Sequence, residues 1–474
     1  YGRNVTSTET WTWLHAPSFR ATPLDMKAEA DLHFIEGINQ LIGHGWPYSP
    51  PEAGEPGWRF YASAAFNDHN PWFQVMPEIT RYLQRVSFLM RQGVPANDIA
   101  IYLPTDDAWA GFQPGKTSVN EAMPGLLGPT LIPQILNAGY NFDYIDDRAI
   151  MKVGVPYRLL IIPATGRMPA ETLARIKAYQ NKGGLVIDMR RAQVTESLLH
   201  QMLAPDLSVN PKAAPAIGFV HRKLPSADIY FIVNTSNDNV ETPVKARITG
   251  LSAEWWDPFT GERSPASDLN LKLAPYESRV LVFSKDVVPA RNRESTRPEQ
   301  TLDLSADWSV TFEGLHKTVQ MARLESWTAG EETRFYSGTA AYEKTIEIPK
   351  GFGKATLDFG PGEKVDPPSG NAPGMRALLE SPVRECALVY VNGQLAGSVW
   401  HPPYEVDISR RLQPGTNRLR IEVANLAINE MAGRALPDYR LLNLRYGTRF
   451  EPQGFENLHP LPAGIIGPVT LILR

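Results

Sequence analysis

The stretch "LDMKAEADLHFIEGINQLIGHG", residues 24–45, predicts a helix followed by a short apolar strand that ends in glycines. Four apolar residues recur at helical spacing: Leu24, Ala28, Leu32 and Ile35. Upstream, "VTSTETW" at 5–11 alternates like a strand, and a second helix is predicted over 70–93. This βαβα order is typical of the last two units of a (β/α) barrel, to which we assign residues 1–93.

Three further domains are predicted downstream, making a multidomain chain of α/β and all-β parts. Residues 94–204 alternate short apolar strands with helices, which indicates a doubly wound parallel sheet. Residues 205–290 predict a small antiparallel β domain, and the polar stretch "VPARNRESTRPEQ" at 288–300 a linker. Residues 291–474 predict a β-sandwich of the jelly-roll, galactose-binding-like type, in which "VNGQ" at 391–394 supplies a hairpin turn.

The composition excludes several classes of function. A net charge of −4 without basic clusters argues against nucleic acid as a partner, and no apolar run reaches the ~18–20 residues that span a membrane. The single cysteine, Cys386, excludes a disulfide framework. No nucleotide-binding glycine motif, no G-x-S-x-G and no H-E-x-x-H occurs. The chain starts with neither a Met nor a signal segment, and we expect it to be part of a larger polypeptide.

Glu9 is the leading candidate for chemistry. It lies near the end of the first predicted strand, among threonines and tryptophans. In a (β/α) barrel the carboxyl ends of the strands face the active site. Sugar hydrolysis needs two carboxyl groups, one to protonate the leaving oxygen and one to activate water or attack the sugar. The alternative is that Glu9 is a solvated surface acid.

Other aromatic and polar residues in this region are candidates for substrate contact. Aromatic faces can stack on sugars, and polar side chains can bind sugar hydroxyls. The candidates are Trp11, Asn39, His44, Trp46, Trp58 and Asn67. A buried, hydrogen-bonded histidine is the alternative for His44, and we assign Trp72 to the core. Paired acids at 106–107 and 146–147 could bind a hard cation, but turns and helix caps are the favoured interpretation.

Several motifs, taken together in their order along the chain, resemble those of a known enzyme family. In order, "STETWTW", "GINQLIGHGWPYSP", "PGWRFYASAAFNDHNPWF", "RYLQRVSFLMRQG" and "IAIYLPTDDAW" resemble glycoside hydrolase family 106, the α-L-rhamnosidases. The segment "VNGQLAGSVWHPPYEVDISRRLQPGTNRLRIEVAN" is similar to the jelly-roll modules of that family and of β-glucuronidase-type enzymes. The resemblance covers nearly the whole chain.

The resemblance implies a secreted or periplasmic inverting hydrolase that releases L-rhamnose from oligosaccharides, polysaccharides or glycosides. It also implies an active-site calcium ion, whose ligands we do not identify. Glu9 matches the later of the family's two catalytic glutamates, the general base. The general acid lies upstream in that family, and this chain begins eight residues before Glu9. No residue here is assigned as the acid, and the isolated chain is expected to be inactive.

Two alternatives stay open. One is a related exo-glycosidase of the β-galactosidase type, because the doubly wound domain also resembles the middle domain of some of those enzymes. The other is a non-catalytic carbohydrate-binding or assembly protein that uses the sandwich.

Overall fold

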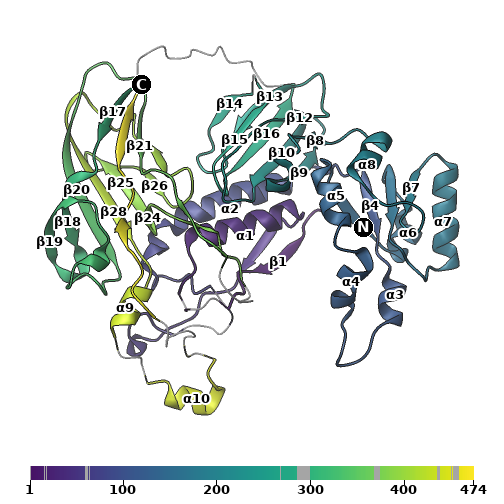
Figure 1. The fold of residues 1–474 in the computed structure, drawn as a ribbon, viewed down its shortest axis with the longest axis horizontal. Helices are drawn as coiled ribbons and strands as arrows, with labels where there is room; N and C mark the ends of the chain where they lie inside the picture. The colour runs from purple at the N-terminus through teal and green to yellow at the C-terminus, as the bar shows by residue number, and fades with distance from the viewer. Residues whose placement is uncertain are drawn as a thin grey trace.

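The computed structural model describes residues 2–14, 17, 19–58, 62, 64–266, 268–285, 299–367, 374–434, 438–449, 451 and 458–474. The N-terminal elements lie at the centre of the molecule, between a β-sandwich and a smaller β unit (Figure 1). A lobe built around a parallel sheet lies on the right of this view. Residues 288–298 of the predicted linker lie outside the described residues.

The N-terminal unit contains two parallel strands joined by a helix. Strand β1 (Ser7–Thr10) pairs with β2 (Gln40–Gly43), so that Glu9 lies opposite Ile42. The connecting helix is α1 (Pro23–Ile35); the 3₁₀ turn Pro71–Val75 and α2 (Met76–Met90) follow β2. One parallel βαβ unit is therefore present, and its membership of a (β/α) barrel stays a prediction.

Helix α1 begins at Pro23, one residue before the stretch predicted to be helical. Thr22 caps the helix in a reciprocal box with Asp25, and Pro23 occupies the first turn. The helix is buried on more sides than the predicted stripe: Leu24 belongs to the core of the sandwich, whereas Phe34 belongs to a second core. The structure thus corrects the expectation of a single apolar face, because α1 packs against several units at once.

The parallel sheet is a doubly wound arrangement in the order β5-β4-β6-β7. Its strands are β4 (Ile99–Tyr102), β5 (Phe142–Ile145), β6 (Leu159–Ile162) and β7 (Leu185–Asp188). Helices cover both faces: α3 (Thr105–Ala110), α4 (Val119–Leu127), α5 (Leu131–Asn137), α6 (Asp147–Val153), α7 (Ala170–Asn181) and α8 (Glu196–Met202). Separate apolar clusters lie above and below the sheet.

The smaller β unit is antiparallel, as predicted. Its six strands run in the order β14 (Arg263–Pro265), β13 (Ser252–Trp256), β16 (Ser278–Ser284), β10 (Ala227–Asn234), β9 (Ile217–Lys223) and β3 (Val94–Pro95). Two short pairs accompany them: β11 (Val240–Pro243) with β15 (Asn270–Leu273), and β8 (Leu207–Ser208) with β12 (Lys245–Ala246). Strand β3 pairs with β9, so Val94 belongs to this sheet rather than to the parallel one.

The C-terminal unit consists of two antiparallel sheets that share one core. The larger sheet contains β19 (Lys317–Arg323), β18 (Ala306–Phe312), β20 (Thr339–Ile348), β28 (Gly415–Ala424), β25 (Cys386–Val391) and β26 (Gln394–Val399). The smaller contains β17 (Gln300–Asp303), β30 (Thr470–Leu473), β21 (Ala355–Asp358) and β27 (Glu405–Asp407). This is a β-sandwich, and its jelly-roll classification stays a prediction.

Short elements complete the C-terminal unit. They are the pairs β22 (Glu363–Lys364) with β23 (Leu379–Glu380) and β24 (Val383–Arg384) with β29 (Gly464–Ile465), and the helices α9 (Ile428–Gly433) and α10 (Arg440–Tyr446). The predicted hairpin turn is present, because Asn392 and Gly393 both have positive φ and Val391 pairs with Gln394.

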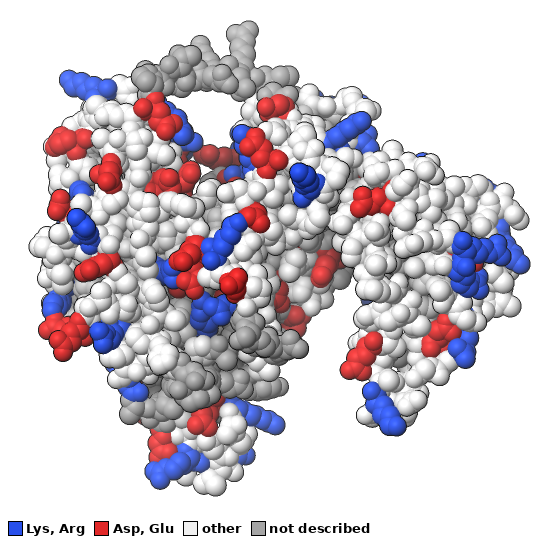
Figure 2. Space-filling model, in the orientation of Figure 1, with Lys and Arg blue, Asp and Glu red and all other residues white. Residues whose placement is uncertain are grey.

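Acidic and basic side chains are interspersed over the face in Figure 2, which also shows the parallel-sheet lobe separated from the body by a notch. None of the helices in the described ranges is long and apolar enough to cross a membrane.

Candidate functional site

Glu9 lies at the carboxyl end of β1, and its side chain is 64% exposed. Its Oε1 atom accepts a hydrogen bond of 2.8 Å from the hydroxyl of Thr12. Its other oxygen, Oε2, makes no hydrogen bond to any residue that the structure describes. The carboxylate is therefore held at one oxygen and open at the other.

His44 approaches Glu9 from the neighbouring strand. It follows β2 directly, and its backbone N–H donates to the carbonyl of Thr10 at 2.9 Å. Its Nδ1 lies 3.9 Å from Oε1 of Glu9. The parallel register therefore brings the ends of β1 and β2 together and makes Glu9 and His44 spatial neighbours.

Trp11 supports this site from below rather than facing it. The side chain is only 5% exposed, its Nε1 donates to the carbonyl of Met26 at 3.0 Å, and its ring packs edge-on against Phe66. Gly43 makes room for that ring, since a Cβ there would lie 2.9 Å from an atom of Trp11. The structure gives Trp11 a packing role, which departs from the predicted substrate contact.

Asn39 is the second predicted substrate contact that lies away from Glu9 in the structure. Its Oδ1 accepts from the N–H of Thr6, and its Nδ2 donates to the carbonyls of Asn4 and Met90. It precedes β2, at the amino end of the parallel pair, whereas Glu9 and His44 lie at the carboxyl end. Its buried amide fastens three segments together, and this use of its polar atoms accounts for the difference from the prediction.

The remaining aromatic and amide candidates lie in the loops after β2. Trp46 is 57% exposed and packs edge-on against Phe73. Asn67 is buried, and its Nδ2 donates to the carbonyl of Pro47 at 3.0 Å, which fixes the loop that carries Trp46. Trp58 is half-buried, and its backbone N–H donates to Ser49. Of the three aromatic candidates, Trp46 therefore has the largest exposed fraction, and sugar stacking requires an accessible ring.

Two polar features escaped the prediction. One is the hydrogen bond from Thr12 to Glu9. Its local signal is the spacing of three residues across the turn that ends β1. The other is the pair of Glu55 and His69, whose Oε2 and Nδ1 atoms are 2.9 Å apart. That contact links two loops and has no signature in residue spacing.

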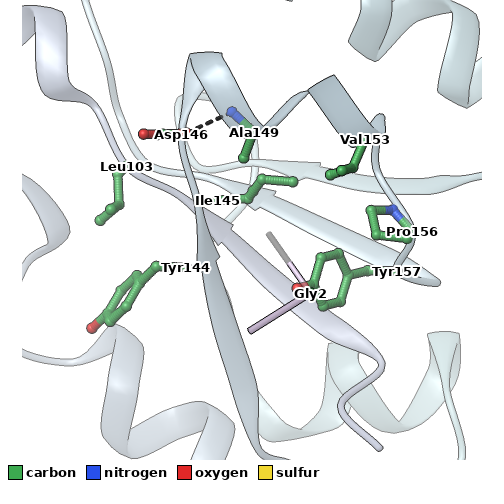
Figure 3. A pocket seen from close by; sticks show the side chains of 9 residues that line it. All are labelled: Gly2, Leu103, Tyr144, Ile145, Asp146, Ala149, Val153, Pro156 and Tyr157. Carbon is green, nitrogen blue, oxygen red and sulfur yellow. Dashed lines mark hydrogen bonds between the residues drawn. The ribbon is translucent and has the colours of Figure 1, made fainter. Parts of the chain in front are cut away.

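A cavity of about 360 Å³ lies elsewhere, on the parallel-sheet lobe at the end of β5 (Figure 3). Tyr144, Asp146 and Tyr157 contribute to its wall, and Asp146 caps α6 by accepting from the N–H of Ala149 at 2.7 Å. Burial, followed by the charge of Asp143 and a hydrogen bond to it, raises the pKa of Tyr157. None of the seven candidate residues lines this cavity, so we assign it no part in the chemistry.

The described residues do not fit the implied calcium ion. Calcium takes roughly six to eight oxygen ligands, several of them usually carboxylates. Nowhere in the described part of the chain do three or more acidic, histidine or cysteine side chains converge as a metal site would require. Among the acids predicted to serve turns and caps, Asp146 does so by capping α6. Asp107 instead accepts from Thr165 and Gly166, and Asp147 accepts from Tyr102 and Thr172. We therefore derive no step through calcium.

The chain is similar to a glycoside hydrolase family model and to a solved rhamnosidase structure. The family model of glycoside hydrolase family 106, described as alpha-L-rhamnosidase, matches residues 1–192 and 180–268. The fold is similar over the whole chain to the rhamnosidase from Novosphingobium sp. PP1Y, with a TM-score of 0.77, 23% identity and 48% of that protein covered. At that identity the likeness shows the fold alone.

A curated relative from Formosa agariphila, provisionally named a beta-glucuronidase, is 24% identical over 314 residues, which cover 55% of this chain and 25% of the relative. The GH42 beta-galactosidase Gan42B reaches a TM-score of only 0.41 at 15% identity, over 58% of this chain and 53% of its own, and carries no argument. The chain thus spans about half of the Novosphingobium protein and a quarter of the Formosa protein.

The matched segments run together from residue 1 to residue 268, which is more than half of the 474 residues. They contain β1, β2 and the Glu9 carboxylate with its neighbours. The chain belongs to glycoside hydrolase family 106, the family whose model is described as alpha-L-rhamnosidase.

Proposed function

We propose that this chain is the C-terminal part of a glycoside hydrolase that cleaves terminal α-L-rhamnosides with inversion, and that Glu9 is its general base. The observation that carries the proposal is the carboxylate of Glu9, held at Oε1 by Thr12 and open at Oε2 at the end of a parallel strand. Membership of family 106 supports the sugar. We assign His44 and Trp46 to substrate contact.

The reaction is a single displacement. Glu9 takes a proton from a water molecule, the water oxygen bonds to the anomeric carbon, and the bond from that carbon to the glycosidic oxygen breaks. A carboxylic acid upstream of this chain protonates the departing oxygen. Such a pair of carboxyl groups stands roughly 6.5–9.5 Å apart, which leaves room for the water. An exposed Glu9, rather than one engaged in an ion pair with Arg or Lys, suits the acceptance of that proton.

The test uses the full-length protein and 4-nitrophenyl α-L-rhamnoside. We expect β-L-rhamnose as the first product anomer in ¹H NMR, because inversion converts the α linkage to β. Glu9→Gln should lower kcat by roughly 10²–10⁴-fold, the usual contribution of a general base. The matched control is Glu52→Gln, which changes an exposed glutamate in the loop after β2 and should leave kcat unchanged.

Two results would overturn the proposal. A Glu9→Gln variant with full kcat would remove Glu9 as the base. A full-length protein that turns over a β-galactoside or β-glucuronide but no rhamnoside would replace the sugar. The 474-residue chain alone should show no turnover, because this proposal places the second carboxyl group in a part of the protein upstream of it.

A further inference from the structure

The turn after β1 brings Thr12 back to Glu9. Trp11, between them, has a φ of +63°, in the left-handed region that side chains other than glycine seldom adopt. Its buried ring and its hydrogen bond to Met26 hold the backbone in that conformation. As a result the exposed side chains of Glu9 and Thr12 meet above the buried indole, with 2.8 Å between Oγ1 and Oε1.

This contact makes the two oxygens of the carboxylate unequal. Oε1 accepts the hydroxyl of Thr12 and faces Nδ1 of His44 at 3.9 Å. Oε2 has no hydrogen-bond partner among the residues of the described ranges. An exposed glutamate without such a contact would sample several rotamers, and in most of them neither oxygen would keep a fixed direction.

We infer that Thr12 is a positioning residue that fixes Glu9 so that Oε2 is the oxygen which takes the proton from water. The inference rests on the proposed function. General-base catalysis depends on a lone pair directed at the water, so a misdirected carboxylate lowers kcat even when its charge and the substrate pocket are unchanged. Thr12 does not touch the substrate and acts only through Glu9.

The test is a set of substitutions in the full-length enzyme. Thr12→Val keeps the shape and removes the donor, and we expect kcat to fall roughly tenfold to a hundredfold with KM within about twofold. Thr12→Ser restores the hydroxyl and should recover most of kcat. Thr8→Val is the matched control, since the hydroxyl of Thr8 donates to the backbone carbonyl of Glu9 and not to its carboxylate.

A second measurement separates positioning from loss of structure. In Glu9→Ala, azide can attack the anomeric carbon without a base and give the β-glycosyl azide. Adding Thr12→Val in that background should leave the azide-rescued rate unchanged, because Thr12 has no carboxylate left to position. A rescued rate that falls as far as kcat fell with Glu9 present would overturn the inference, as would a Thr12→Val enzyme with full kcat.

The two proposals fail in different ways. If Glu9→Gln keeps full activity, the general-base assignment is wrong whatever Thr12 does. If Glu9→Gln is inactive and Thr12→Val is fully active, the base assignment stands and the positioning role alone is wrong.

Discussion

Lys27 and Asp31 form an ion pair within α1, with 2.6 Å between Nζ and Oδ2, and their side chains are 0% and 2% exposed. Lys27 also donates to the carbonyl of Tyr276, and Asp31 accepts from the hydroxyl of Tyr82. Burial raises the pKa of Asp31, and the charge of Lys27 opposes that shift. The pair therefore joins the helix behind the candidate site to α2 and to the smaller β unit.

Removing one partner should destabilise the protein strongly. Lys27→Met or Asp31→Leu leaves a buried charge without its partner, at a cost of about 3–5 kcal/mol. The double variant should lose much less than the sum of the two, because it leaves no unpaired charge. Urea unfolding of the four proteins measures this, and additive losses would contradict it.

The burial of Lys27 and Asp31 could not be predicted from the sequence. The apolar spacing of α1 predicts one buried stripe, but the sandwich and the smaller β unit cover other sides of the helix. The structural role of Asn39 was missed for a similar reason, because its hydrogen-bond partners Asn4 and Met90 lie 35 and 51 residues away in the sequence. Where the signal is local, prediction succeeded. The apolar strands around Ile101 and Ile161 and the Asn392-Gly393 turn are correct because each depends on neighbouring residues.

His33 should make stability depend on pH in the alkaline range. Its Nε2 lies 3.3 Å from Glu29 and its Nδ1 3.7 Å from Glu36, and contacts with the two carboxylates, Glu29 first, raise the pKa of His33 to about 9. The folded state thus binds the proton more tightly than the unfolded state does. The stabilisation is complete below about pH 6.5 and is lost as the pH rises through about 9.

The effect is smaller than the roughly 3 kcal/mol that a shift from 6.5 to about 9 would give, because Glu36 is largely exposed and the ring is partly exposed to solvent. Denaturant midpoints between pH 6 and 10 measure it. His33→Gln should flatten that slope, and Glu29→Gln should shift its midpoint to lower pH. An unchanged slope in His33→Gln would assign the pH dependence to other groups.

Gly43 should tolerate no side chain. A Cβ there would lie 2.9 Å from Trp11 and 3.1 Å from Phe66, so Gly43→Ala must displace the indole that supports the turn under Glu9. Such overpacking costs about 1–3 kcal/mol. We expect a lower Tm together with a lower kcat in the full-length enzyme. Gly125→Ala, on α4 with open space around its Cβ, is the matched control and should leave both unchanged or raise Tm slightly.

Trp46 and Asn39 should separate binding from stability, although the sequence nominates both for substrate contact. Trp46 is 57% exposed, so Trp46→Ala removes little buried area and should leave Tm unchanged. A lost aromatic contact worth about 1 kcal/mol would raise KM roughly fivefold.

Asn39→Ala should do the reverse, because Asn39 is 3% exposed and its amide bonds Thr6, Asn4 and Met90. Leaving the buried carbonyl of Met90 and the partly buried groups of Thr6 and Asn4 unpaired costs about 1–3 kcal/mol, which thermal unfolding detects, while KM for the aryl rhamnoside stays constant. If Asn39→Ala instead raised KM without lowering Tm, the amide would have to face the substrate. That outcome would require the amino end of β2, rather than its carboxyl end, to face the sugar.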